Sequence, residues 1–324
     1  GGARSFRVGR DSEPAAATVD LFVRDGEVLC FLDAWQSGLA VGVPGTVALY
    51  KRAHDDYGKL PWAELFEPAI RLAEQGFKVS PRMADSLVYV APIGRLDENP
   101  ATAAYFFPNG QPLQAGHLLR NPEYAATLRR IAEVGIVVFY SGEIAEAIAK
   151  AAQEEPLGGR LSVEDIASYE VIERPVICGR FRVQKLCTTS PPSSGVAQIM
   201  IAGIYDHLVT AAATQQDKVA AFVDAQRLAY ADRDHYIGDP RSVSIPIDEL
   251  LHPDYIRHRA GERFAPAETP RHGDPGEVLR DKPIAHVLGP DKTREAPGTT
   301  HLSIIDSQGN AVAMTATGEF YFGS

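Results

Sequence analysis

The sequence predicts a fold that mixes helices and strands, either α+β or α/β, and three segments carry this prediction. Residues 215–236 place apolar side chains at the spacing of an amphipathic helix. Residues 171–187 contain two runs of strand-forming residues, divided by a Gly-Arg pair. Residues 299–317 contain two more β-rich runs, separated by Ser-Gln-Gly. Long helical and alternating β patterns in one chain exclude the all-α and all-β classes.

The remaining elements follow in chain order. Residues 1–43 mix short apolar runs with turn formers, which predicts strands and loops. Helical segments are expected from Pro44, from Pro61 to about Gly76, from Pro81, at 121–133, at 141–152, behind a Ser162 cap, and at 196–205. Residues 191–195 predict a loop. The segment from about 259 to 298 is rich in Pro, Gly and charge, which predicts an exposed connector.

Within 215–236, one stripe of side chains is expected to face the core. It consists of Val219, Phe222, Val223, Gln226 and Tyr230. The aromatic positions of the 215–236 helix are interpreted as core residues.

Composition narrows the functional classes. Hydrophobic residues make up 45% and charged residues 23% of the chain, as in globular proteins. A formal net charge of −10 argues against nucleic-acid binding, which needs clustered Lys and Arg. No apolar run approaches the roughly 18 residues that a membrane span needs. Cys30, Cys178 and Cys187 are too few and too scattered for a disulfide scaffold or a zinc site, so we expect them reduced and buried.

The β-rich runs at 299–317 predict a hairpin with Gly309 in the left-handed position. In that register Asp306 faces Asn310, and Thr299 faces Thr317. Directly opposed side chains on one face have Cβ atoms about 4.5–5.5 Å apart, so the two hydroxyls would lie within hydrogen-bond reach. An ordinary cross-strand threonine pair has the same pattern.

Gly298 favours a catalytic interpretation of Thr299. A residue without Cβ leaves its carbonyl open to attack by the next hydroxyl, and the preceding connector would let the ends separate after cleavage. A new N-terminus at Thr299 would gain an α-amine with a pKa of about 7.7–8.0. That amine can act as the base for its own hydroxyl. Thr317 would then orient or polarise this hydroxyl.

With these features the chain resembles the γ-glutamyltranspeptidase family of N-terminal-nucleophile hydrolases, in particular its bacterial members. Residues 299–303 (TTHLS) and 309–312 (GNAV) are similar to the start of that family's small subunit. Further similar blocks, in the family's order, are 41–47 (VGVPGTV), 57–62 (YGKLPW), 139–145 (FYSGEIA), 191–195 (PPSSG) and 229–233 (AYADR). Each block is weak alone, but the ordered set is specific.

The resemblance implies an α+β, four-layer αββα sandwich in one structural domain. It implies self-cleavage between Gly298 and Thr299 into a large-subunit part, 1–298, and the start of a small subunit, 299–324. The mature enzyme would be a γ-glutamyltransferase and glutathione hydrolase. It would form a γ-glutamyl ester on Thr299, which water or an amino-acid or peptide acceptor resolves. No cofactor and no metal are implied, and the compartment stays open between periplasmic or secreted and cytoplasmic.

Few further site residues carry over. Arg10 is similar to the family's arginine for the donor α-carboxylate, which a planar guanidinium pairs with bidentately. Thr317 matches the threonine that hydrogen-bonds the nucleophile. Glu319 stands where the family has Asn at the substrate α-amine, and Asp11 where it has Glu. Val196 replaces the second Gly after residues 193–195. The resemblance also implies that the chain is truncated at both ends, with the oxyanion-hole residues beyond Ser324.

Other interpretations stay open. Glu319 keeps alive an acylase for glutaryl-type amides, and an unprocessed, catalytically silent homologue with a binding role is a third possibility. His301 lies two residues from Thr299 on the same face, and we expect a structural hydrogen-bonding role because the mechanism needs no imidazole. Ser193 and Ser194 lack a Gly-x-Ser-x-Gly elbow and predict a turn.

Overall fold

A computed structural model describes residues 5–8, 12–154, 157–284 and 299–318 of the chain. The chain divides into two compact units. Unit 1 comprises Gly1–Arg7 and Glu173–Arg294, and unit 2 comprises Val8–Ile172 and Glu295–Ser324. Helices and strands both occur, so the predicted α+β class is confirmed. The four-layer sandwich and the single domain concern how the units are arranged, and they stay predictions.

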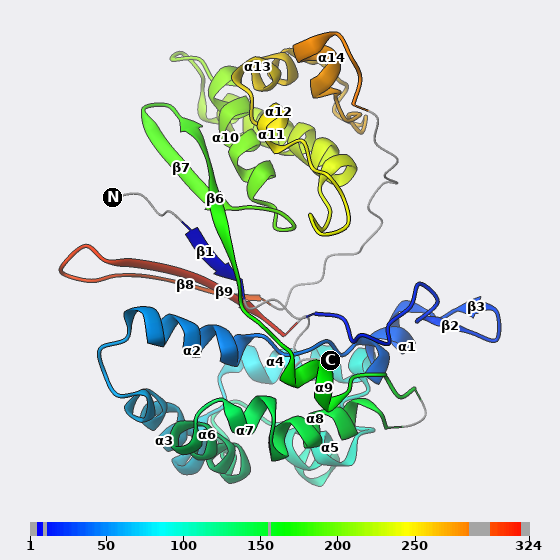
Figure 1. Cartoon of the computed structure of the whole chain (residues 1–324), viewed down its shortest axis with the longest axis vertical. Helices are drawn as coiled ribbons and strands as arrows, with labels where there is room; N and C mark the ends of the chain where they lie inside the picture. The colour runs from blue at the N-terminus through cyan, green and yellow to red at the C-terminus, as the bar shows by residue number, and fades with distance from the viewer. Residues whose placement is uncertain (1–4, 9–11, 155–156, 285–298, 319–324) are drawn as a thin grey trace. The chain divides into compact units, whose positions relative to one another are not determined.

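Unit 1 combines a small antiparallel sheet with a group of helices (Figure 1). The sheet has the order β1-β6-β7, with β1 at Ser5–Val8, β6 at Ile172–Phe181 and β7 at Gln184–Thr189. The helices are α10 (Gly195–Leu208), α11 (Gln215–Tyr236), α12 (Ile247–Leu250), α13 (Pro253–Gly261) and α14 (Pro275–Arg280). Their shared core is built around Met200, Ile204, Leu228 and Leu250. The buried helix expected at 196–205 is therefore confirmed as part of α10.

Helix α11 has the predicted bounds but buries a different face. A capping box between Thr214 and Asp217 starts it. The stripe expected in the core is exposed, with Val219 at 55%, Phe222 at 47%, Val223 at 45% and Tyr230 at 37%. The buried face carries Ala221, Ala225, Leu228, Ala229, Asp232 and Tyr236. The core prediction was therefore wrong for Phe222 and Tyr230 and is confirmed for Tyr236, which is 1% exposed. Alanines on the buried side let α10 and α11 pack closely, with Leu228 and Tyr236 in their shared core.

The β6–β7 turn lies further along the chain than the sequence predicted. The strands continue through Gly179 and Arg180 and turn at Arg182 and Val183, where Arg182 has φ 54°. Gly179 lies inside β6 because a Cβ there would come 2.2 Å from Ile199 Cγ2 of α10. Its role is close packing, and the expected break at this glycine was wrong.

This hairpin also overturns the expectation for the cysteines. The register places Cys178 directly opposite Cys187, with their Cα atoms 4.1 Å apart, and a disulfide joins them. Cys30 is free and exposed. The expectation of three reduced, buried cysteines was wrong because strand pairing brings two distant positions into contact.

The expected connector is partly folded. Its first residues end α13, where Arg259 is fully buried, and α14 follows at Pro275–Arg280. The prediction of an exposed connector was therefore wrong at Arg259 and across α14, whereas residues 262–272 lack helix and strand and are mostly exposed, as predicted. Pro and Gly here serve as helix starts and close contacts: Gly273 approaches Tyr255, and a Cβ at Gly276 would come 2.5 Å from the Lys282 carbonyl oxygen. Residues 285–298 lie outside the described part.

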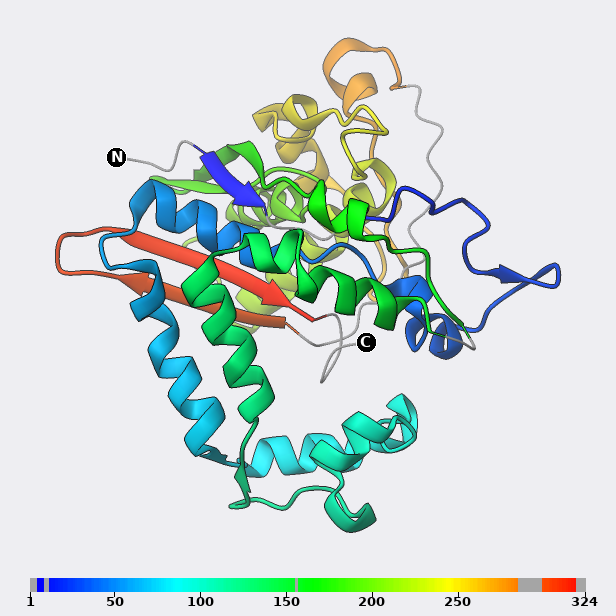
Figure 2. The ribbon, with the colours of Figure 1, turned by 60° about the horizontal axis from the view of Figure 1, so that its bottom comes forward.

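Unit 2 is mostly helical and confirms the helices expected there. Its helices are α1 (Phe31–Trp35), η1 (Gly38–Ala40), α2 (Thr46–Tyr57), η2 (Trp62–Phe66), α3 (Glu67–Gln75), α4 (Pro81–Gly94), α5 (Pro100–Phe106), η3 (Pro108–Gly110), α6 (Pro122–Val134), α7 (Val137–Tyr140), α8 (Glu143–Ala152) and α9 (Val163–Ala167). Short ladders pair β2 (Val23–Arg24) with β3 (Glu27–Val28), and β4 (Phe77–Lys78) with β5 (Leu118–Leu119). Figure 2 shows α3 and α6 side by side, and they share a core that contains Ile70 and Leu128.

Two local features tie unit 2 together. Ser162 caps α9 in a capping box with Asp165, as its sequence predicted. The Tyr140 hydroxyl donates to the Pro44 carbonyl oxygen (2.7 Å) and accepts from the Ala48 amide (3.0 Å), which fixes the start of α2. Within the described ranges, no helix is long and apolar enough to span a membrane.

Candidate functional site

The candidate site lies on a hairpin of two strands, β8 (Thr299–Ile305) and β9 (Ala311–Thr317) (Figure 1). The strands pair antiparallel in a register that runs from Thr299 opposite Thr317 to Ile305 opposite Ala311. This is the register that the sequence predicted. A slip of one residue would turn one of the two threonines to the other face.

The turn residue Asp306 fixes that register at the closed end of the hairpin. Its carboxylate accepts the amides of Gln308 and Asn310, both at 2.9 Å, and the Asn310 side-chain amide at 2.8 Å. Gly309 adopts φ 81°, the left-handed conformation expected for it. The side-chain hydrogen bond from Asn310, with the backbone donors, lowers the pKa of Asp306 below its ordinary value.

One face of the hairpin is polar. Alternation along each strand puts Thr299, His301 and Ser303 on this face, opposite Thr317, Thr315 and Ala313. His301 Nδ1 lies 2.8 Å from Thr315 Oγ1, and Nε2 lies 3.1 Å from Ser303 Oγ. Both ring nitrogens of His301 thus make the hydrogen-bonding contacts expected of it, and the structural role stays a prediction. The opposite face carries Leu302, Ile304 and Val312, which are exposed.

Of the site residues predicted from the sequence, the structure brings together Thr299 and Thr317. They form the last opposed pair at the open end of the ladder, and Thr299 is exposed. Gly298, Arg10 and Glu319 lie outside the described residues. Backbone pairing thus fixes Thr299, the first residue of β8, opposite Thr317.

The residues Ser193 and Ser194 lie in the predicted loop before α10. Ser194 is the N-cap residue of α10, which begins at Gly195. A Cβ at Gly195 would come 1.9 Å from the Thr189 carbonyl oxygen, so this position needs glycine where the loop passes β7. The turn predicted here is confirmed.

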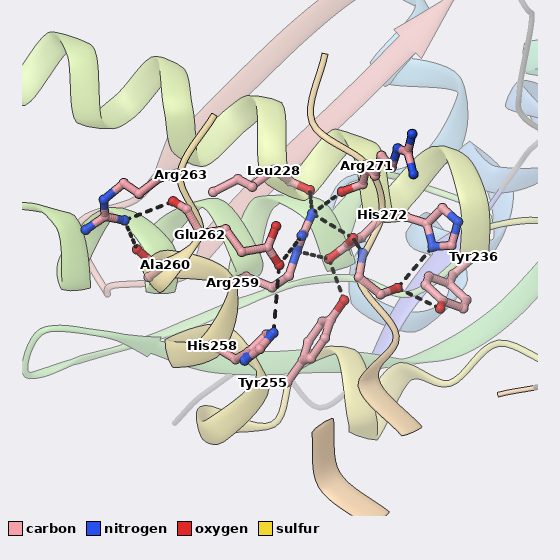
Figure 3. A network of polar contacts seen from close by, with 12 residues as sticks. Leu228, Tyr236, Tyr255, His258, Arg259, Ala260, Glu262, Arg263, Arg271 and His272 are labelled. Carbon is pink, nitrogen blue, oxygen red and sulfur yellow. Dashed lines mark hydrogen bonds and ion pairs between the residues drawn. The ribbon is translucent and has the colours of Figure 1, made fainter. Parts of the chain in front are cut away.

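Unit 1 holds a buried ion pair that the sequence did not reveal (Figure 3). Arg259 and Asp232 are both 0% exposed, with Nε 3.0 Å from Oδ2 and Nη2 3.0 Å from Oδ1. Tyr255 and the Gly273 amide donate to the same carboxylate, at 3.0 and 2.8 Å. Burial raises the pKa of the Asp232 carboxyl, and Arg259 with the two donors opposes that rise.

Arg259 has further partners, while its buried Nη1 makes no hydrogen bond among the described residues. Nη2 donates to the carbonyl oxygens of Leu228 (3.1 Å) and Arg271 (2.9 Å), and Nη1 forms an ion pair with Glu262 (2.6 Å). Figure 3 shows Arg259 among these partners, which come from α11, α13 and the segment before α14. The network joins three segments of unit 1 around a fully buried ion pair, so it contributes to the packing of this unit. Asp232 belongs to the AYADR block that the sequence singles out, whereas no sequence pattern points to its partner Arg259, 27 residues further along the chain.

Comparison with known proteins decides the family. The family model described as Gamma-glutamyltranspeptidase matches residues 3–324. The chain belongs to the γ-glutamyltranspeptidase family. Among the described residues, no group of three or more His, Cys, Asp or Glu side chains is arranged to hold a metal ion.

Relatives within the γ-glutamyltranspeptidase family are similar along nearly the whole chain. The glutathione hydrolase proenzyme of Bacillus subtilis (strain 168) is 32% identical over 97% of this chain and 54% of its own length. That of Escherichia coli (strain K12) is 35% identical over 97% of this chain and 52% of its own length. The chain thus spans about half the length of these curated relatives.

A solved family member shares the α+β fold of this chain. The crystal structure of Helicobacter pylori γ-glutamyltranspeptidase superposes with a TM-score of 0.74 at 30% identity, covering 90% of this chain and 82% of that chain. Against the family pattern, Val196 has a structural explanation, since it is 1% exposed and packs in the core of unit 1.

Proposed function

We propose that this chain belongs to an autoprocessing γ-glutamyl transferase and hydrolase in which Thr299 is both the cleavage point and the nucleophile. The observation that carries the proposal is the register of the β8–β9 hairpin, which sets Thr299 directly opposite Thr317. The relatives' description as glutathione hydrolase proenzymes supports both the processing and the substrate class.

Processing would begin with attack of the Thr299 hydroxyl on the Gly298 carbonyl. The peptide nitrogen leaves as the new α-amine, and the chain is held briefly by an ester on Thr299 Oγ. Water hydrolyses that ester and frees Gly298 as a carboxylate. The products are a large-subunit part, 1–298, and a small subunit that starts at Thr299.

Turnover would use the same hydroxyl. The free amine of Thr299 accepts the hydroxyl proton as Oγ attacks the γ-glutamyl carbonyl, and the donor's amine leaves with a proton. Thr317 Oγ1 holds the nucleophile's oxygen from across the hairpin. Water gives hydrolysis of the γ-glutamyl ester, and an amino-acid or peptide amine gives transfer.

Two residues, both inferred from the family resemblance of the sequence, would recognise the donor. Arg10 would pair with the α-carboxylate through its planar guanidinium, and Glu319 would pair with the α-ammonium. Glutathione is the proposed donor. Because Glu319 adds a negative charge where the family has an amide, an acylase for glutaryl-type amides is the second candidate.

Intact-mass measurement of the protein expressed from its complete gene tests the processing step. A species that begins at Thr299 is expected after incubation, and its persistent absence would leave a silent, unprocessed homologue as the remaining interpretation. Hydrolysis of a γ-glutamyl anilide and of a glutaryl anilide, which lacks the α-amine, then separates the two activities. Equal rates on both anilides would refute γ-glutamyl specificity.

A further inference from the structure

The imidazole of His301 bridges the two strands next to the threonine pair. His301 stands directly opposite Thr315, so these two residues form the same-face pair adjacent to Thr299 and Thr317. The 2.8 Å contact from Nδ1 to Thr315 Oγ1 crosses the hairpin, and the 3.1 Å contact from Nε2 to Ser303 Oγ runs along β8. Both ring nitrogens therefore have hydroxyl partners.

We propose that His301 is a positioning residue, whose bridge to Thr315 and Ser303 holds the open end of the hairpin in the register that sets Thr299 opposite Thr317. This inference rests on the proposed function of Thr299. In this proposal His301 positions the strands and does not accept a proton from Thr299.

The geometry separates these roles. Ser303 lies on the side of His301 that is further from Thr299 along β8, and Thr315 lies across from it. A neutral imidazole has one donor and one acceptor nitrogen, and here each is occupied by a hydroxyl. A base for Thr299 would need a ring nitrogen directed toward the start of β8, and the described contacts use both nitrogens elsewhere.

The hairpin needs such a bridge because its other specific clamp is distant. Asp306 and Asn310 fix the register at the turn, and Thr299 and Thr317 lie at the opposite ends of their strands. Among the described contacts, the His301–Thr315 pair is the side-chain hydrogen bond across the strands that lies nearest the reacting pair.

Two substitutions test the bridge. Thr315→Val removes the hydroxyl and keeps the β-branched shape, and His301→Phe keeps an aromatic ring without nitrogens. Each is expected to slow formation of the Thr299 N-terminus about tenfold. Each also lowers kcat per processed subunit by a similar factor, with the KM for a γ-glutamyl anilide unchanged. The double variant should be no slower than His301→Phe alone, because that variant already lacks the contact to Thr315.

Thr188→Val is the matched control. Thr188 Oγ1 donates to Gln198 Oε1 at 2.8 Å on the β7 strand, so this variant loses a threonine hydrogen bond away from the hairpin. It should leave the cleavage rate and kcat within about twofold of wild type. A fall equal to that of Thr315→Val would show that the effect is general loss of stability, and would overturn the inference.

The pH profile and a conservative variant separate positioning from proton transfer. His301→Asn retains a donor and an acceptor near the place of Nδ1, and it is expected to recover most of the rate lost in His301→Phe. The bell shape of kcat against pH should be unchanged in both variants, since only its height depends on register. Loss of the acidic limb in either variant would make His301 a base and overturn the proposal.

The two levels of the proposal fail differently. A wild-type protein that is never cut at Thr299 refutes the proposed function, and this inference with it. A wild-type protein that is cut, with Thr315→Val and His301→Phe cut equally fast, refutes the positioning role alone.

Discussion

The buried pair of Asp232 and Arg259 gives the largest stability effect that the structure predicts. Arg259→Met keeps a long side chain but leaves the fully buried carboxylate of Asp232 without its cation. Breaking one partner of a buried ion pair costs about 3–5 kcal/mol. The retained hydrogen bonds from Tyr255 and Gly273 favour the lower part of that range. Two carbonyl oxygens, of Leu228 and Arg271, lose a donor and add to the cost.

Urea unfolding followed by far-UV circular dichroism measures the loss, and hydrogen exchange of the α11 and α13 peptides localises it to unit 1. Arg257→Met is the matched control on the same helix, since Arg257 is 64% exposed and pairs only with the exposed Asp254 in the described contacts. Its cost should stay below about 0.5 kcal/mol. Replacing both buried partners, as Asp232→Leu with Arg259→Met, should recover most of the stability.

The loss also depends on pH, with a sign that follows from the raised pKa of Asp232. A carboxyl whose folded pKa lies above its unfolded value destabilises the fold at high pH, and this penalty disappears as pH falls below both values. Without Arg259 the pKa rises further, so the deficit of Arg259→Met should be smaller at pH 5 than at pH 8. A deficit under 1 kcal/mol, or one that grows on acidification, would refute the reasoning.

Three further predictions concern other features. Asp306→Ala removes the acceptor in the turn and should speed hydrogen exchange of the hairpin amides. In wild type, the pKa of Asp306 is lowered in the folded state. The protection of these amides that depends on Asp306 is therefore present above about pH 3.9 and is lost as pH falls through the folded pKa. Cys187→Ser opens the disulfide loop of sequence separation 9, which should cost about 2.5 kcal/mol in the loop-closure estimate, and non-reducing peptide mapping checks the bond first. Unchanged stability in the oxidised and the variant protein would contradict that estimate. Thr299→Ala should abolish both the cut after Gly298 and turnover of a γ-glutamyl anilide, and an active variant would end the nucleophile assignment.

The sequence predicted what short-range rules govern. The hairpin register followed from a turn with Gly309 and from strict alternation, and each of the long helices began near its expected residue. These are local features, decided within a few residues by backbone conformation and capping.

Long-range packing decided the rest. The buried face of α11 carries several alanines, because α10 packs close to it. The Cys178–Cys187 pair and the Asp232–Arg259 pair join residues whose contact depends on strand register or helix packing, and the Pro- and Gly-rich composition around Arg259 predicted exposure. The spacing of apolar residues in a sequence predicts an amphipathic helix, but it does not predict which element that helix packs against.

The number of residues in each arm of the hairpin, β8 and β9, limits how this hairpin can vary among relatives. Thr299 and Thr317 each stand six residues from the inner pair, Ile305 and Ala311. A single-residue insertion or deletion inside either arm would move one threonine to the opposite face, whereas changes at residues 307–309 would leave both in place. Length variation is therefore expected at the tip of the hairpin, and cleaved, active relatives should have arms of unchanged length.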